Sequence, residues 1–173
     1  MIINRVWSMP SSQTFTIKPI RELLTRYIKN PEKWIDPFAG YNSPAYWSND
    51  LDESAKTLYH TEASVFCRHL LYQLKMVESF EWGLFDPPYS ARQITEHYKA
   101  VGHQADMVDT SNTFYSRVLV YMAKLIKSGG YLIHCGWNSN GYGKSNGFEI
   151  VEILLVAHGG QHHDTIVTVE IKI

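Results

Sequence analysis

A four-residue stretch, Asp86-Pro87-Pro88-Tyr89, follows the apolar run 82–85 and carries the clearest chemistry in the sequence. The Asp86 carboxylate accepts hydrogen bonds, and Pro87 presents its carbonyl in a restricted direction. Two such acceptors can hold both hydrogens of an exocyclic amine and orient its lone pair toward an electrophile. Tyr89 can then stack on the ring that carries the amine. Asp and Pro are also common in ordinary turns, so the tetrapeptide alone leaves both interpretations open.

Several short apolar runs of the chain end in a polar or aromatic residue that could serve a ligand. The residues at these ends are Asp36, Asp50, Glu62, Asp86 and Trp137. Helical patterns over 14–30, 63–76, 91–102 and 113–130 separate the runs. Residues 147–158 and 164–173 form two β-rich runs in the manner of a hairpin. This order predicts an α/β fold with a mostly parallel sheet and a C-terminal antiparallel hairpin. In such sheets, ligands bind outside the carboxyl ends of the strands.

The connection between the first two predicted strands is unusually short. Only residues 39–44 separate them, whereas a helical crossover between parallel strands takes about a dozen residues or more. We therefore expect either an irregular coil at this point or strand boundaries that differ from the predicted ones.

The composition excludes several classes of protein. With 173 residues, a net charge of −1 and 45% apolar residues, the chain has the size of one globular domain without an overall positive field. Two distant cysteines, Cys67 and Cys135, exclude a disulfide scaffold and a four-thiolate zinc site. No apolar run approaches the roughly 18 residues of a membrane span, so we expect a soluble, cytoplasmic protein with no membrane partner. His158, His162 and His163 fit a solvated hairpin turn better than a metal site.

Together, these motifs resemble those of the DPPY-type S-adenosylmethionine-dependent N6-adenine DNA methyltransferases, especially small members from phages and mobile elements. The resemblance extends from about residue 14 to the C-terminus. It implies a Rossmann-like class I methyltransferase fold, one domain over 1–173, and expression in a bacterial or phage-infected bacterial cell. Asp86, Pro87, Pro88 and Tyr89 would be the catalytic residues, S-adenosylmethionine the cofactor and DNA the partner.

The resemblance also implies a set of binding residues. WIDPFAG is similar to the cofactor motif DPFxGxG, SNDLD to a strand end that meets the cofactor ribose, and TFTIKPI to a segment beside the cofactor's methionine moiety. The implied cofactor contacts are Asp36, Phe38, Ala39, Gly40, Asp50 and Ile17. The resemblance also implies a substrate contact at Glu62. Four further substrate contacts are expected from position alone: Arg92 shortly after the tetrapeptide, and Trp137, Asn138 and Lys144 on a loop at a strand end. For Arg92 and Lys144, an ordinary solvated charge is the alternative.

Few residues are available for recognising a target sequence. Only residues 91–112 and 137–146 are left for this task. We therefore expect either relaxed sequence specificity or a homodimer whose two subunits recognise the target together. The second glycine of the cofactor motif is missing, because Tyr41, Asn42 and Ser43 follow Gly40. Two alternatives stay open: a methyltransferase that acts on an RNA base amine or a protein glutamine, and a non-catalytic binding module that kept the fold.

Overall fold

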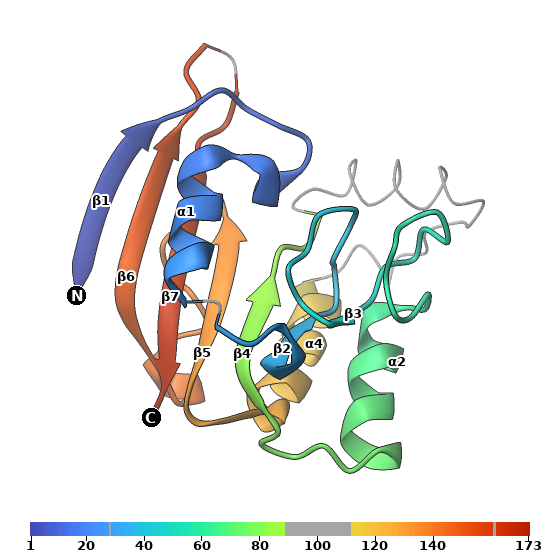
Figure 1. The fold of residues 1–173 in the computed structure, drawn as a ribbon. Helices are drawn as coiled ribbons and strands as arrows, with labels where there is room; N and C mark the ends of the chain where they lie inside the picture. Colours follow the sequence, from blue (N-terminus) through green and yellow to red (C-terminus); the bar gives the residue numbers. More distant parts are fainter. Residues whose placement is uncertain (28, 89–111, 161) are drawn as a thin grey trace.

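The computed structural model describes residues 1–27, 29–88, 112–160 and 162–173, with side chains from residue 115 onward in the third range. A single seven-stranded sheet dominates it (Figure 1). In chain order, the main elements are β1 (Ile2–Trp7), α1 (Lys18–Tyr27), β2 (Trp34–Asp36), β3 (Trp47–Ser48), α2 (Ala63–Arg68), β4 (Phe80–Phe85), α4 (Asn112–Leu125), β5 (Ile126–Gly136), β6 (Phe148–Ala157) and β7 (Thr165–Lys172).

The order of strands across the sheet is β1-β6-β7-β5-β4-β2-β3. β7 lies antiparallel to both neighbours, β5 and β6, and every other pair is parallel. The chain leaves β2 for β3 on one side and later builds β4 and β5 on the other. Such a reversal opens a crevice at the carboxyl ends of the strands. The fold class predicted from the sequence is confirmed.

Helices cover both faces of the sheet. Ile20, Leu23 and Leu24 project from one side of α1 and are buried, and Pro19 stands in the first turn, where its missing N–H costs no hydrogen bond. α1 packs with the buried side chains of one face, including Leu84 and Ile133. α2 and α4 pack together over the opposite face. The sheet is therefore packed between α1 on one face and α2 with α4 on the other.

Three elements differ from the sequence-based prediction. The N-terminal residues form β1, an exposed edge strand parallel to β6, which the sequence patterns did not reveal. No strand ends at Glu62, because the chain there makes only an isolated bridge between Asn49 and Tyr59 before α2 begins. The helix expected over 113–130 ends at Leu125, four residues before Gly129, and β5 begins at once.

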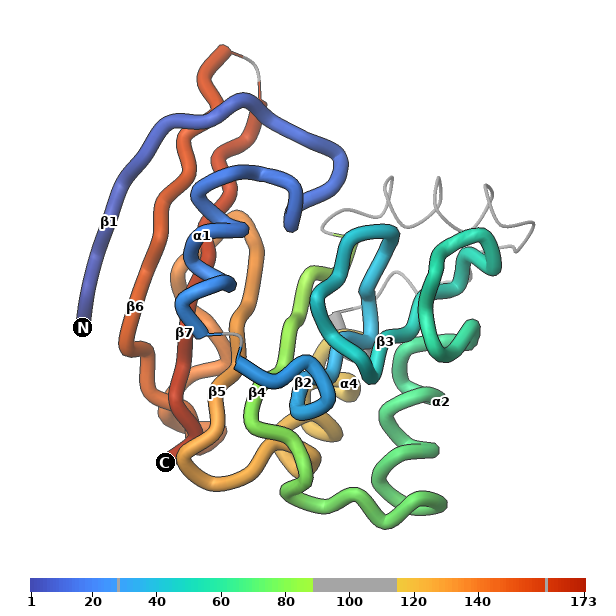
Figure 2. Tube along the Cα trace, in the orientation of Figure 1, coloured from blue at the N-terminus to red at the C-terminus, as the bar shows by residue number. Residues whose placement is uncertain are grey.

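The connection from β2 to β3 is an irregular coil over residues 37–46, which is the first of the two alternatives that the short spacing left open. The segment after β1 crosses above the ends of β6 and β7 before it turns down into α1 (Figure 2). Within the described ranges, no helix has the length and apolar character that a membrane crossing would need.

Candidate functional site

A cavity of about 600 Å³ lies at the carboxyl ends of the strands. Its walls come from the residues that follow the strands: 10–15 after β1, 37–42 after β2, 49–51 after β3, 86–88 after β4 and Trp137 after β5. Thr61 and Ala63 beside the start of α2, Tyr115 of α4, and the connection between β6 and β7 complete them. Because all these strands end at one edge, segments distant in the sequence meet around one space.

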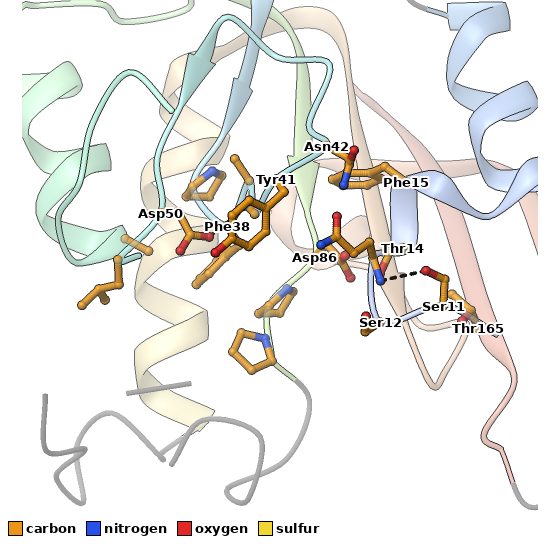
Figure 3. Close-up of a pocket in the computed structure, with 18 of the residues that line it drawn as sticks. Ser11, Ser12, Thr14, Phe15, Phe38, Tyr41, Asn42, Asp50, Asp86 and Thr165 are labelled. Atoms are coloured by element: carbon orange, nitrogen blue, oxygen red, sulfur yellow. Dashed lines mark hydrogen bonds between the residues drawn. The ribbon is translucent and has the colours of Figure 1, made fainter. Parts of the chain in front are cut away.

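Asp86 stands between two sides of this cavity (Figure 3). On one side lie Phe38 and Asp50, from the segments after β2 and β3. On the other side lie Ser11 and Thr165, from the segment after β1 and the start of β7. We call the first the β2–β3 side and the second the hairpin side.

Two carboxylates hold the loop of the β2–β3 side. Asp36, the last residue of β2, accepts the Phe38 N–H at 3.0 Å and the Ser43 hydroxyl at 2.6 Å. Asp50 accepts the Gly40 N–H at 2.9 Å through one oxygen and the Asp52 N–H at 2.9 Å through the other. The loop is therefore shaped by fixed hydrogen bonds although it contains no helix.

The missing second glycine causes no backbone strain in this loop. Gly40 has φ +54°, a conformation that favours glycine, and a Cβ built on it would have open space around it. Asn42, which replaces the second glycine, is not among the residues with positive φ. Its position is therefore open to an ordinary L-residue, and its side chain contributes to the cavity wall.

Aromatic side chains hold the chain on either side of Asp86 and Pro87. Tyr115 of α4 donates its hydroxyl to the Pro88 carbonyl at 2.6 Å. The Phe38 ring contacts Phe85 edge to face at 5.5 Å and Tyr115 at 6.0 Å between centroids. The same cluster thus supports the loop after β2 and the segment after β4, and it fixes one relative to the other.

Burial changes the acid–base chemistry below the cavity. Asp36 is fully buried, and this desolvation raises its pKa from 3.8 to about 7, although the hydrogen bonds from Ser43 and Phe38 oppose the shift. The neighbouring charges of Asp86 and Asp50 raise it further. His134 of β5 has its pKa lowered to about 4 by burial and is neutral at pH 7. No group of three or more potential metal ligands occurs among the described residues.

Several residues predicted from the sequence lie together on the cavity wall. They are Phe38, Ala39, Gly40, Asp50, Asp86, Pro87, Pro88 and Trp137. Asp36 lies directly behind this wall and shapes it through Ser43 and Phe38. Tyr89 and Arg92 fall outside the described residues, as does most of the 91–112 segment.

Ile17 and Glu62 take positions other than those expected. Ile17 is 4% exposed and packs in the core under α1, so it does not line the cavity, whereas Thr14 and Phe15 of the same segment do. Glu62 is the N-cap of α2, where its carboxylate accepts the Ser64 N–H at 2.5 Å. It lies between two lining residues without lining the cavity itself.

Lys144 and Asn138 also lie apart from the cavity. β6 runs parallel to β5, so residues 137–147 must return from the carboxyl edge of the sheet to the opposite edge. Lys144 stands at that opposite edge, just before β6, and pairs with Glu149 at 2.7 Å. Asn138 is exposed and accepts the Asn140 N–H. Of the loop 137–146 that we expect to contact the target, only the first residue, Trp137, therefore lines the cavity.

The hairpin side contains residues that the sequence patterns did not assign to the site. Residues 10–13 reach it because β1 ends at the same edge as β6. His158, His162 and His163 reach it because they follow β6. The order of strands, which the sequence does not reveal locally, is what brings both segments to Asp86.

Comparison with solved structures finds several that are similar to this chain. One is the Burkholderia thailandensis 1,6-didemethyltoxoflavin-N1-methyltransferase with bound 1,6-didemethyltoxoflavin and S-adenosylhomocysteine, at 13% identity and a TM-score of 0.56, covering 90% of this chain and 77% of that chain. Another is M. jannaschii TYW2 in complex with AdoMet, at 11% identity and a TM-score of 0.39, covering 95% and 78%. No family model and no curated protein matches the sequence. The first structure shows a Rossmann-like methyltransferase fold for this chain.

Proposed function

We propose that this protein transfers a methyl group from S-adenosylmethionine to the N6 amine of adenine in DNA. The observation that carries the proposal is the position of Asp86, Pro87 and Pro88 on the same cavity as residues 38–40 and Asp50. A carboxylate suited to hold an amine thus shares one space with a loop suited to hold the cofactor.

The residues of the β2–β3 side fit S-adenosylmethionine. Gly40 leaves open space where other residues carry a Cβ, so a ligand can approach the backbone closely. The Asp50 carboxylate retains acceptor capacity for ribose hydroxyls beside its two backbone N–H partners. The Burkholderia enzyme, which contains S-adenosylhomocysteine, supports S-adenosylmethionine as the cofactor. When bound, the cofactor supplies an activated methyl group on a sulfonium.

The chemistry required of the chain is mainly alignment. Asp86 accepts one hydrogen of the adenine amine and the Pro87 carbonyl accepts the other, which orients the nitrogen lone pair toward the methyl group. No general base is needed before attack, because the amine proton can leave afterwards. A base inside a duplex cannot reach Asp86, so the target adenine must be flipped out of the stack. Tyr89 is then the proposed stacking face.

The experiment compares methyl transfer by the purified protein with that of Asp86→Ala. The substrates are unmethylated duplex DNA, RNA and a glutamine-containing peptide, and mass spectrometry identifies the product. We expect N6-methyladenine in DNA, reduced at least about a hundredfold in Asp86→Ala because the amine loses its alignment. Glu81→Ala is the matched control, since Glu81 is exposed on the same strand and pairs with Lys127 away from the cavity.

Calorimetric titration with S-adenosylmethionine accompanies each variant. Asp86→Ala should keep the cofactor affinity of the wild type within a few-fold. A methyl group on RNA or glutamine alone would replace the DNA proposal with the corresponding alternative. Cofactor binding without any methylated product, or equal activity of Asp86→Ala, would contradict the proposed chemistry. A folded wild-type protein that binds no cofactor would favour the non-catalytic module.

A further inference from the structure

The hairpin side of the cavity has a composition of its own. Six residues that line it are Ser11, Ser12, Gln13, Trp137, His163 and Thr165. None of its lining residues between 10 and 14, or after 136, is a carboxylate, a lysine or an arginine. Hydroxyl, carboxamide and aromatic groups of this kind suit a neutral heteroaromatic ring with hydrogen-bonding edges better than an ion.

The side-chain oxygen of Gln13 has no hydrogen-bond partner within the part of the chain that the structure describes. This Oε1 atom is buried, and no donor among the described residues reaches it. The backbone of Gln13 is fixed on both sides: its N–H donates to Ser11 Oγ at 3.1 Å and its carbonyl accepts from Thr16 Oγ1 at 2.7 Å. Gln13 lines the cavity, and a buried acceptor without a donor destabilises the folded protein. A rotation of the side chain that brings Oε1 from its buried position to a ligand N–H would therefore remove a cost already present.

Trp137 and His163 form a pair of rings on the same side. Their centroids lie 4.7 Å apart and their planes are tilted by 32°. Trp137 is 43% exposed, and His163, two residues before Thr165, is exposed as well. The pair therefore presents aromatic surface to solvent at the cavity, although it comes from two segments separated by 25 residues of chain.

We propose that the hairpin side is a nucleotide subsite, in which Gln13 hydrogen-bonds the edge of the acceptor base and the Trp137–His163 pair stacks on the base next to it. That the ligand is a nucleic acid rests on the proposed function. The stacking face and the side-chain oxygen of Gln13 are observations that do not depend on it. Stacking on aromatic side chains is how proteins commonly bind unpaired bases without reading their sequence. The subsite therefore selects single-stranded or locally opened DNA with little sequence preference.

The first experiment measures binding of a fluorescein-labelled single-stranded DNA with one adenine between thymines, by fluorescence anisotropy without cofactor. Trp137→Ala should weaken binding about tenfold, and Trp137→Phe should retain most of the affinity. A second DNA carries abasic sites in place of the flanking thymines. It should bind the wild type about tenfold more weakly, with no further loss in Trp137→Ala. Tyr72→Ala is the control, since Tyr72 is 57% exposed and lies outside the cavity.

The second experiment separates a binding role of Gln13 from a structural one. Gln13→Met keeps the length of the side chain and removes the unpaired oxygen, so the melting temperature should stay equal or rise. The affinity for the adenine-containing DNA should nevertheless fall several-fold. A fall in both quantities would mean that Gln13 only supports the fold, and unchanged binding would overturn its assignment.

The outcomes distinguish this proposal from the proposed function. If the wild type binds DNA through Trp137 but transfers no methyl group to it, the subsite stands and the catalytic proposal fails. If methyl transfer occurs but Trp137→Ala binds both DNAs like the wild type, the subsite is wrong and the catalytic proposal stands. Absence of DNA binding by the folded wild type at high micromolar concentration would also overturn the subsite.

Discussion

The Asp50 carboxylate accepts the backbone N–H of Gly40 at 2.9 Å, so the residue after β3 holds the loop that follows β2. Its other oxygen accepts the Asp52 N–H. The sequence suggested Gly40 and Asp50 as separate cofactor contacts, but this hydrogen bond joins them directly. The shape of the cofactor loop should therefore depend on Asp50 even before any ligand binds.

Asp50→Asn should weaken S-adenosylmethionine binding by about tenfold or more, because an amide has one acceptor oxygen for two backbone donors. We expect the melting temperature to fall by about 2–4 °C as the unpaired N–H loosens the loop. Calorimetry and thermal unfolding measure the two effects. Glu53→Gln, an exposed neighbour, is the control and should change neither. Wild-type affinity in Asp50→Asn would argue against a cofactor on the β2–β3 side.

The buried carboxyl of Asp36 should make stability depend on pH. Burial raises its pKa to about 7 in the folded protein, from 3.8 in the unfolded chain. Between these values the folded state holds a proton that the unfolded state has lost. The contribution of Asp36 to the free energy of unfolding therefore falls as pH rises from about 4 to about 7, by up to about 4 kcal/mol.

Asp36→Asn removes this titration and keeps an oxygen for the Phe38 N–H. The free energy of unfolding of Asp36→Asn relative to the wild type should thus increase with pH across the same window. Urea unfolding of both proteins between about pH 4 and pH 8 measures it. Parallel stability curves for the two proteins would mean that Asp36 titrates normally and is less buried than the structure indicates.

The positions of Asp36, Asp50 and Asp86 at one edge of the sheet could be predicted, because the information is local. Asp36, Asp50 and Asp86 each follow a short apolar run, and the rule that parallel strands share a carboxyl edge brings such residues together. The irregular crossover after β2 was also predictable, since its length leaves no room for a helix. Neighbouring residues were enough for these placements, whereas the roles proposed for the three carboxylates came largely from the family resemblance.

The hairpin side could not be predicted, because it depends on pairing between distant strands. β1 is exposed on both faces, so its sequence shows no buried alternation. Only its parallel pairing with β6 carries residues 10–13 to Asp86. In the same way, the pairing of β7 between β5 and β6 makes the chain after Trp137 return to the opposite edge and separates Trp137 from Lys144. Glu62 did carry a local signal, an acidic residue just before an apolar helical run, which fits an N-cap as well as a strand end.

Lys144→Ala should leave both DNA binding and methyl transfer unchanged within about twofold. Its ammonium pairs with Glu149 at the amino end of β6 and is 72% exposed, away from every residue that lines the cavity. The anisotropy and methyl-transfer assays described above provide the measurement. A large loss of DNA affinity would show that the nucleic acid extends around the molecule to that edge of the sheet.

Glu62→Ala should destabilise the protein through α2 rather than through the active site. The Glu62 carboxylate accepts both the N–H and the hydroxyl of Ser64, at 2.5 and 2.6 Å, and so caps a helix of six residues that begins at Ala63. Loss of such a cap costs about 1 kcal/mol, which corresponds to a fall of about 2–4 °C in melting temperature for a chain of this size.

Glu62→Asp separates capping from substrate contact, because aspartate is among the preferred N-cap residues. We expect Glu62→Asp to recover most of the stability lost in Glu62→Ala, and both variants to bind S-adenosylmethionine and DNA like the wild type below their melting temperatures. If Glu62→Ala instead keeps wild-type stability and loses methyl transfer, the carboxylate must leave Ser64 and turn into the cavity when substrate binds. Glu62 would then be the substrate contact that the sequence suggested, and the capped arrangement would describe the ligand-free protein alone.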